Sequence, residues 1–144
     1  MKLAFFRGYG IRHLLIPILL FGLIFAQRGY AEITLQQANG DALVIPGPAT
    51  KIVALAPNLA EIVFAAGAGG HLVAVVEYSN FPEQVRDIQR VGDAFRIDLE
   101  HIIALEPDLV IAWASGNPQT ALQKLEQLGF PVLQVEITRP EEIA

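Results

Sequence analysis

Short apolar runs alternate with helical patterns along most of this chain, and that alternation limits its fold more than any other feature. The segment from Lys51 to Ala56 is almost entirely apolar, as in a strand that is buried on both faces of a sheet. A helical pattern follows at once and stops at Gly67, because glycine readily adopts the left-handed conformation at a helix end. Further strands are expected at 72–76, 109–113 and 132–137, and further helices at 98–105 and 118–128. This order predicts an α/β fold, a Rossmann-like parallel sheet with helices on both faces.

Each expected helix begins beside a residue that suits a helix start. Asn58 precedes Glu61 by three positions, as in a capping box, and Asp98 stands just before the next helical pattern. Asn117 is followed by Pro118, which suits the first position of a helix. We therefore expect the side chains of these two asparagines and of Asp98 to accept hydrogen bonds from the first turns.

The beginning of the chain has the pattern of an export signal. Basic residues precede an apolar run at 14–26, and no acid appears before Glu32. The run is too short to span a bilayer, which takes about 20 residues. It is followed by Gly29-Tyr30-Ala31, a small-x-small end. Residues 1–31 are therefore predicted to be a cleavable signal peptide; the alternative is an uncleaved membrane anchor.

The segment after the predicted signal peptide, residues 32–47, is expected to form an antiparallel hairpin. Residues 33–36 and 42–45 flank Asn39-Gly40, a pair that suits a two-residue turn. Residues 48–144 would then form the α/β lobe. The chain stops just after a capping box that begins at Thr138, so we expect a truncated lobe; the alternative is a natural end with a frayed tail.

Charge and cysteine content narrow the class of protein. The whole chain has a formal charge of −5, and without residues 1–31 six basic residues face fifteen acidic ones, a charge of −9. This balance argues against a nucleic-acid partner. With no cysteine, the chain has neither a disulfide nor a lipoprotein anchor, which fits an exported protein of a bacterial periplasm.

Sequence motifs for catalysis and metal binding are absent. The chain contains no dinucleotide-binding or phosphate-binding glycine motif and no nucleophile elbow. His13, His71 and His101 lack the spacing that organises a metal. The sequence therefore predicts a protein that is not an enzyme and holds no metal or cofactor of its own.

Residues at the carboxyl ends of the expected strands are the best candidates for a binding site, because open α/β sheets bind ligands there. The longest connection, residues 78–97, is expected to be mostly loop, with a helical turn around 83–87, and long loops are often functional. The candidates at this edge are Pro57, Asn58, Tyr78, Phe81, Phe95 and the segment 113–117. Their aromatic surface suits a large apolar ligand; the alternative is that the aromatic side chains complete the core.

Several segments resemble a known family. Lys51 to Gly69 resembles the opening of class III periplasmic substrate-binding proteins, and Val73 to Pro82 resembles the stretch that follows it there. Further matches occur in the family's order at 90–92, 98–100 and 103–113. The Ala-Trp ending of the last segment is most similar to the cobalamin-binding branch of that family. The resemblance covers residues 48–144.

This resemblance implies a fold of two Rossmann-like lobes with the ligand between them, of which this chain supplies the first. It implies a binding component of an ABC importer that captures cobalamin (vitamin B12) and delivers it to a permease in the inner membrane. Tyr78 and Trp113 match aromatic positions that contact the corrin ring. Glu100 matches a glutamate that docks onto arginines of the permease.

One position departs from the cobalamin-binding branch. Where that branch has a tryptophan, this chain has Ala94, with Phe95 beside it. Phe95 is the expected substitute; without it, a receptor for an iron-siderophore or haem in the same family becomes the alternative. The sequence also leaves open a small α/β enzyme and a membrane-tethered interaction module.

Overall fold

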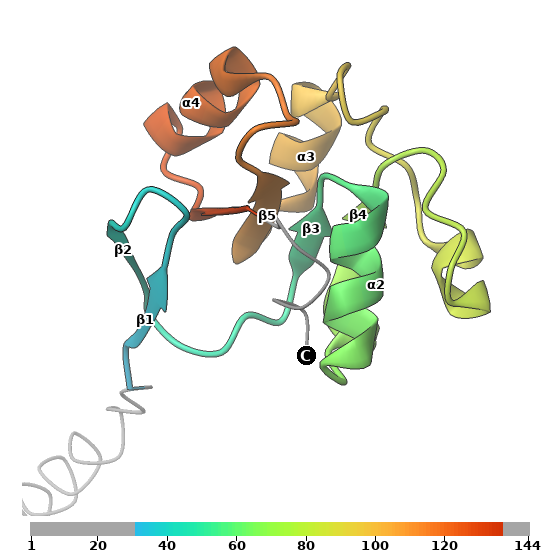
Figure 1. Cartoon of the computed structure of the whole chain (residues 1–144), viewed down its shortest axis with the longest axis horizontal. Coiled ribbons are helices and arrows are strands. Elements are labelled where there is room, and N and C mark those ends of the chain that lie inside the picture. Colours follow the sequence, from blue (N-terminus) through green and yellow to red (C-terminus); the bar gives the residue numbers. More distant parts are fainter. Residues whose placement is uncertain (1–30, 137–144) are drawn as a thin grey trace, which may run out of the picture. The chain divides into compact units, whose positions relative to one another are not determined.

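The computed structural model describes residues 31–136, and four parallel strands form the centre of this part of the chain (Figure 1). The strands are β3 (Ile52–Ala54), β4 (Leu72–Val75), β5 (Leu109–Trp113) and β6 (Val132–Val135). They lie in the order β4-β3-β5-β6. Around them are α2 (Pro57–Ala65), α3 (Leu99–Leu105), α4 (Gln119–Gln127) and 3-10 turns at Gly69–His71 and Glu83–Asp87. The predicted parallel sheet, the turn around 83–87 and the order of elements are confirmed.

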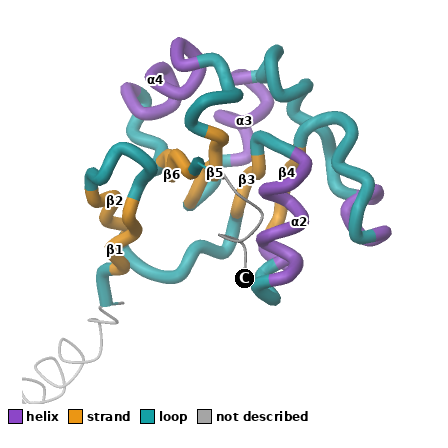
Figure 2. The backbone as a smooth tube through the Cα atoms, in the orientation of Figure 1, coloured by secondary structure: helices purple, strands orange, loops and turns teal. Residues whose placement is uncertain are grey.

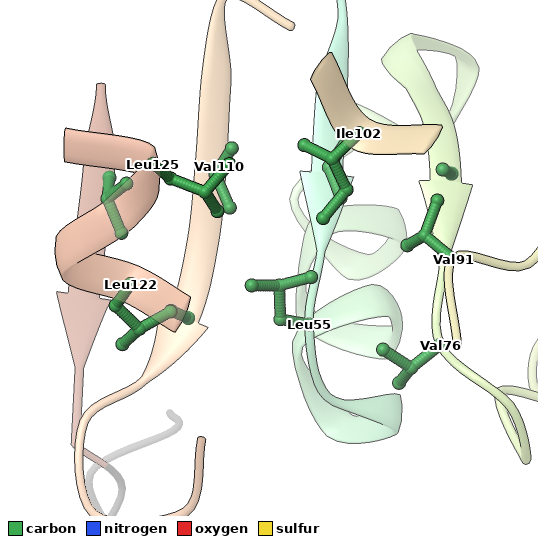
Figure 3. Packing of buried hydrophobic residues seen from close by; sticks show 11 residues of the cluster. Leu55, Val76, Val91, Ile102, Val110, Leu122 and Leu125 are labelled. Carbon is green, nitrogen blue, oxygen red and sulfur yellow. The ribbon is translucent and has the colours of Figure 1, made fainter. Parts of the chain in front are cut away.

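The helices cover both faces of the sheet, as predicted (Figure 2). The two faces of the sheet bury two separate groups of apolar side chains, because successive residues of a strand point to opposite faces. On one face, Ile102 of α3 and Leu122 and Leu125 of α4 lie over Leu55 and Val110 (Figure 3). On the other face, α2 buries one side against β3 and β4. The strands are thus fixed between two apolar layers.

The N-terminal hairpin forms as predicted, but its turn differs from the expected one. Strands β1 (Ile33–Gln36) and β2 (Ala42–Ile45) pair in antiparallel register, which leaves five loop residues between them. Gln37 N donates to Asp41 O at 2.9 Å, and only Gly40 among the loop residues has a positive φ, +89°. Asn39 instead bonds Asp41 through its side chain, at 2.8 Å. The two-residue turn was therefore wrong, since this asparagine prefers a local side-chain bond to a left-handed backbone.

Two of the three predicted helix caps are wrong. Asp98 caps α3 as expected, and its Oδ1 accepts from His101 N at 3.0 Å. Helix α2 instead starts directly at Pro57, whose missing N–H costs nothing at that position, and Asn58 accepts only from Leu59 N. Helix α4 starts at Gln119, one residue after Pro118, and no side chain caps it.

The glycine stops of the first and last described helices are confirmed. Gly67 and Gly129 have φ values of +79° and +87° directly after α2 and α4. Within residues 31–136, none of the helices combines the length and the apolar character that crossing a bilayer requires. The predicted signal peptide, apart from its last residue, and the predicted strand end and capping box at 137–141 lie outside the described residues.

Both edges of the four-stranded sheet are covered by other segments. Next to β6, Ala38 N of the hairpin loop donates to Gln134 O at 2.8 Å. Next to β4, Val75 N donates to Gln89 O and Val91 N donates to Val75 O, both at 3.0 Å. The carbonyl of Gln134 at one edge and the backbone groups of Val75 at the other therefore find partners within this chain.

At the amino ends of the strands, one carboxylate ties β3 to β5. Oδ2 of Asp108 accepts hydrogen bonds from Thr50 Oγ1 at 2.7 Å, Thr50 N at 2.8 Å and Lys51 N at 2.9 Å. The bond from the Thr50 hydroxyl is the largest cause that lowers the pKa of Asp108 below its usual range. The backbone bonds and the Lys51 charge act in the same direction, and partial burial opposes them. This carboxylate therefore stabilises the folded chain only while it is ionised.

Replacing Asp108 by asparagine should lower the free energy of unfolding at neutral pH by about 1 kcal/mol, a value that allows for the exposure of the site. Because the folded state lowers this pKa, the stabilisation is complete above the unfolded value near 4 and is lost as pH falls through the lower folded value. Urea unfolding at pH 7 and pH 3 should therefore show a smaller difference between the two proteins in acid. Asp87→Asn, with the same charge change on an exposed turn, is the control; equal losses at both pH values would contradict the assignment.

Candidate functional site

The order of the strands creates a switch point between β3 and β5. The chain leaves β3 through α2 toward β4, whereas it reaches β5 on the other side of β3. The segments that follow β3 and β5 therefore diverge at the carboxyl ends of these strands, and open α/β sheets place ligands in such a crevice. We call this end of the sheet the carboxyl edge. The start of α2, with Pro57 and Asn58, and the turn 113–117 both lie there.

Asn117 joins three segments at the carboxyl edge. Its side chain is only 4% exposed. Oδ1 accepts from Trp113 N at 2.7 Å, and Nδ2 donates to Leu55 O at 2.8 Å and to Ala94 O at 2.9 Å. The amide thus connects the end of β3, the end of β5 and the long loop that carries Phe95. The sequence placed Asn117 as a helix cap and in the candidate segment 113–117, but it did not predict this role as a tie between three segments.

The indole of Trp113 is held on two sides. Its Nε1 donates to Oε1 of Glu136 at 3.0 Å. Its ring lies against Gly116, where an added Cβ would come within 2.1 Å of Cε3. The ring is partly buried and packs against the apolar residues on the α2 face of the sheet. Trp113 therefore contributes to the core and also reaches the carboxyl edge.

Glu136 was not among the predicted site residues. Besides the indole, it accepts from Ser115 N through Oε2 at 3.0 Å and from Ser115 Oγ through Oε1 at 2.9 Å. The bond from Trp113 is the largest cause that lowers the pKa of Glu136 below its usual range, and the Ser115 hydroxyl is the next. The group is therefore an anion at neutral pH. The local sequence around Glu136 gives no signal for this role, because its partners lie more than twenty residues earlier in the chain.

Tyr78 stands in solvent on an unusual backbone. Its φ is +68°, and its side chain is 79% exposed. A left-handed conformation costs a residue other than glycine about 1 to 2 kcal/mol, so the surrounding structure must fix it. The preceding Glu77 N donates to Gly92 O at 2.8 Å, which fastens this segment to the long loop. The alternative that the aromatic side chains complete the core is therefore wrong for Tyr78.

Phe95 also lies outside the core, on a loop whose backbone is fixed. Its side chain is 74% exposed, while Oδ1 of Asp93 accepts from Phe95 N and Arg96 N, both at 2.8 Å. Gly92 has a φ of +88°, and a Cβ there would lie 2.0 Å from Arg96 O. The tight turn therefore requires glycine and presents Phe95 to solvent. Phe81, elsewhere on the long connection, is 68% exposed as well.

Hydrogen bonds thus link the segments that carry Tyr78, Phe95 and Trp113. The long loop is bonded to the turn 113–117 through Asn117, and to the segment of Tyr78 through Glu77. The turn 113–117 is in turn bonded to the end of β3, just before Pro57 and Asn58. Of these last two residues, Pro57 is half-buried and Asn58 is exposed. The residues predicted to bind the ligand therefore lie on segments at the carboxyl edge: Pro57, Asn58, Tyr78, Phe95 and Trp113.

Glu100 lies at the same end of the lobe. It is exposed in the first turn of α3, where a negative charge is favourable. Asp98 N donates to Val91 O at 3.0 Å, and Val91 is itself bonded to the carboxyl end of β4. The position is therefore accessible to a large partner that approaches the carboxyl edge.

A hollow of about 500 Å³ lies in a different place, between the hairpin and the segment from α4 to β6. It is open to solvent and is lined by Asp41, Glu126, Phe130 and neighbouring residues. None of the predicted site residues lines it. The carboxyl edge remains the candidate site, because the predicted residues lie there and open α/β sheets place their ligands at this edge. Among residues 31–136, no three histidine, aspartate or glutamate side chains gather to hold a metal ion.

Comparison with known proteins identifies the family. Residues 52–143 match the periplasmic binding protein family, and the chain belongs to it. A vitamin B12-binding protein of Vibrio campbellii is 52% identical over 92 residues, which are 64% of this chain and 34% of that protein. A vitamin B12-binding protein of Vibrio cholerae is 47% identical over 102 residues, 71% of this chain and 37% of that protein. The chain thus spans about a third of the length of the curated relatives that it matches.

Solved structures agree with this assignment. The crystal structure of the periplasmic vitamin B12 binding protein BtuF of Vibrio cholerae matches with a TM-score of 0.59 and 49% identity, over 60% of this chain and 34% of that one. A periplasmic heme binding protein from Pseudomonas aeruginosa matches with a TM-score of 0.62 and 27% identity, over 67% of this chain and 34% of that one. The resemblance seen in the sequence is confirmed, and the described sheet corresponds to one lobe of a two-lobe binding protein.

Replacing Asn117 by alanine should lower the free energy of unfolding by about 2 to 4 kcal/mol, because the buried carbonyl of Leu55, the half-buried carbonyl of Ala94 and the N–H of Trp113 lose their partner. Asn117→Asp should be at least as damaging at neutral pH, since its second oxygen would face the carbonyls of Leu55 and Ala94. Urea unfolding followed by circular dichroism measures both changes. Asn80→Ala, on an exposed loop, is the control, and a loss for Asn117→Ala no larger than for this control would contradict the proposed tie.

Proposed function

We propose that this chain is part of the substrate-binding component of an ABC importer, which captures cobalamin in the periplasm and delivers it to an inner-membrane permease. The observation that carries the proposal is the group of aromatic side chains at the carboxyl edge. Tyr78 and Phe95 are mostly exposed. Trp113 reaches the same edge, and its ring is held by a hydrogen bond to Glu136. The similarity to vitamin B12-binding proteins at about half of the aligned positions supports the choice of ligand.

The physical chemistry of the edge suits a corrinoid. Exposed aromatic rings lose unfavourable contact with water when a large, partly apolar ring system covers them. Both exposed aromatics stand on backbone that hydrogen bonds hold, so little backbone entropy would be lost on binding. Pro57 and Asn58 at the start of α2 would supply the adjoining contacts. The matched relatives are binding proteins, and we propose no catalysis for this chain.

A receptor for haem or an iron-siderophore is the second candidate. Ala94 motivates it, because this chain has a small side chain where the cobalamin-binding branch has a tryptophan. Asn117 donates a hydrogen bond to the carbonyl of Ala94, and Phe95 is the next residue in the chain. Cobalamin remains the better supported ligand, since the B12-binding structure is 49% identical, whereas the periplasmic heme binding proteins of Vibrio cholerae and Pseudomonas aeruginosa are 33% and 27% identical.

Binding of cyanocobalamin should depend on the exposed aromatic residues. The test uses the whole protein that the source organism produces from this sequence. In it, Tyr78→Ala and Trp113→Ala should each weaken binding by about 1 to 3 kcal/mol, because each removes a large buried contact from the complex. Tyr78→Ala should leave the unfolding midpoint nearly unchanged, since its side chain is 79% exposed. Isothermal titration calorimetry measures the affinities.

Val44→Ala, an exposed apolar residue on the hairpin, is the matched control for this titration. Unchanged affinity in both aromatic variants would refute the site. Haem and an iron-loaded siderophore serve as competitors, and displacement of cobalamin by either at lower concentration would favour the second candidate.

Glu100 is proposed to dock onto the permease. Glu100→Arg should leave the affinity for cobalamin unchanged but slow association with the permease, because the exposed charge would repel basic residues of the partner. The difference from the unmodified protein should shrink at high salt, which screens exposed charges. Surface plasmon resonance with the permease in lipid nanodiscs measures the rate. Glu126→Arg, with the same charge change in the last turn of α4, is the control; equal rates for both variants would contradict the docking role.

A further inference from the structure

We propose that Glu136 is a positioning residue, which fixes the indole of Trp113 in the orientation that meets the ligand. The proposal rests on the function proposed above, in which Trp113 contacts cobalamin. Glu136 itself follows β6, whereas Trp113 ends β5. The two strands pair in register, with Trp113 opposite Val135, and Ala114 N donates to Val135 O at 2.9 Å. The strand pairing thus delivers the carboxylate to the edge of the indole.

The two oxygens of Glu136 collect three donors from one turn. Oε1 accepts from the indole Nε1 at 3.0 Å and from Ser115 Oγ at 2.9 Å. Oε2 accepts from Ser115 N at 3.0 Å. On the other side, Gly116 lies so close to the ring that it leaves no space for a Cβ. The indole is therefore held at its N–H edge by Glu136 and on its face by backbone.

The chemistry of this cluster requires a carboxylate. All three partners are donors, and an ionised carboxylate offers acceptors only. An amide in its place would keep one acceptor oxygen, while its NH₂ group would face a donor of Ser115. Hydrogen bonds to an ionised acceptor are also stronger than those to a neutral one. A glutamine at position 136 would therefore hold both the turn and the ring less firmly.

The fixed ring would assist binding because its conformational freedom is already lost before the ligand arrives. A side chain that becomes ordered only on binding reduces the affinity by the entropy that it gives up. Releasing the indole from Glu136 should therefore weaken binding even though Glu136 need not touch the ligand. This separates Glu136 from Tyr78 and Phe95, whose side chains are themselves exposed.

Tryptophan fluorescence tests the positioning without any ligand. Trp113 is the only tryptophan among the 144 residues of this chain, so the emission of the chain reports its environment alone. Glu136→Gln should shift the emission maximum and increase quenching by acrylamide, while the far-UV circular dichroism stays unchanged. Glu136→Asp keeps the charge and both oxygens on a shorter side chain. Its emission maximum and acrylamide quenching should therefore lie between those of the unmodified chain and those of Glu136→Gln. Glu61→Gln, an equal charge loss on the exposed side of α2, should behave like the unmodified chain; the same behaviour in Glu136→Gln would overturn the proposal.

A double-mutant cycle tests the consequence for binding. In the whole protein that the source organism produces from this sequence, Glu136→Gln should weaken cyanocobalamin binding about threefold to tenfold. Trp113→Phe removes the indole N–H, so in that background Glu136→Gln should have almost no further effect. Independent, additive losses would show that Glu136 acts by another route and would overturn the proposal. If the unmodified protein bound no cobalamin, the proposed function would fail, and the fluorescence comparison alone would then decide whether Glu136 fixes Trp113.

Discussion

The carboxyl edge of this lobe depends on the hydrogen bonds of one buried amide. Asn117 satisfies backbone groups from the end of β3, the end of β5 and the long loop, three segments that would otherwise leave polar groups buried without partners. At the switch point, the segments that follow β3 and β5 leave the sheet and diverge. Their backbone groups therefore cannot all be paired by neighbouring strands. A short side chain with one acceptor and two donor positions solves that problem. Once the edge is fixed in this way, the segments around it can carry side chains that make few contacts of their own.

Local sequence was sufficient for most of the fold. Apolar runs, glycine stops and the Asp98 cap depend on neighbours within a few residues, and the structure has them where they were predicted. The Asn58 cap failed because α2 already starts at Pro57, so that Asn58 lies inside the helix. The Asn117 cap failed for a different reason. A cap is inferred from the residues that follow, whereas the side chain of Asn117 bonds carbonyls 62 and 23 positions earlier, which a local pattern does not contain. Glu136 was missed for the same reason, since Trp113 lies 23 positions before it.

At the proposed binding surface, the residues that fix the framework differ from those that are exposed to a ligand. Asn117, Glu136, Asp93 and Gly92 fix the backbone or the ring orientation, while the aromatic side chains that they support remain at the surface. Such a division allows the exposed side chains to change without loss of the fold. The replacement of tryptophan by Ala94 beside Phe95 is consistent with it, because the fixed element at that position is the Ala94 carbonyl and not the side chain. Related receptors for different ligands can then share one framework.

The N-terminal hairpin lies beside β6, one of the two edge strands of the parallel sheet. A sheet edge with free N–H and C=O groups is a template on which other chains add strands, and this is a common route to aggregation. Here the hairpin loop bonds β6 on one side, and the segment around Arg90 bonds β4 on the other. Short irregular segments thus occupy part of each edge of the sheet, where a strand from a second molecule would otherwise pair. The hairpin, which carries none of the predicted site residues, therefore covers backbone of β6 with which another chain could otherwise pair.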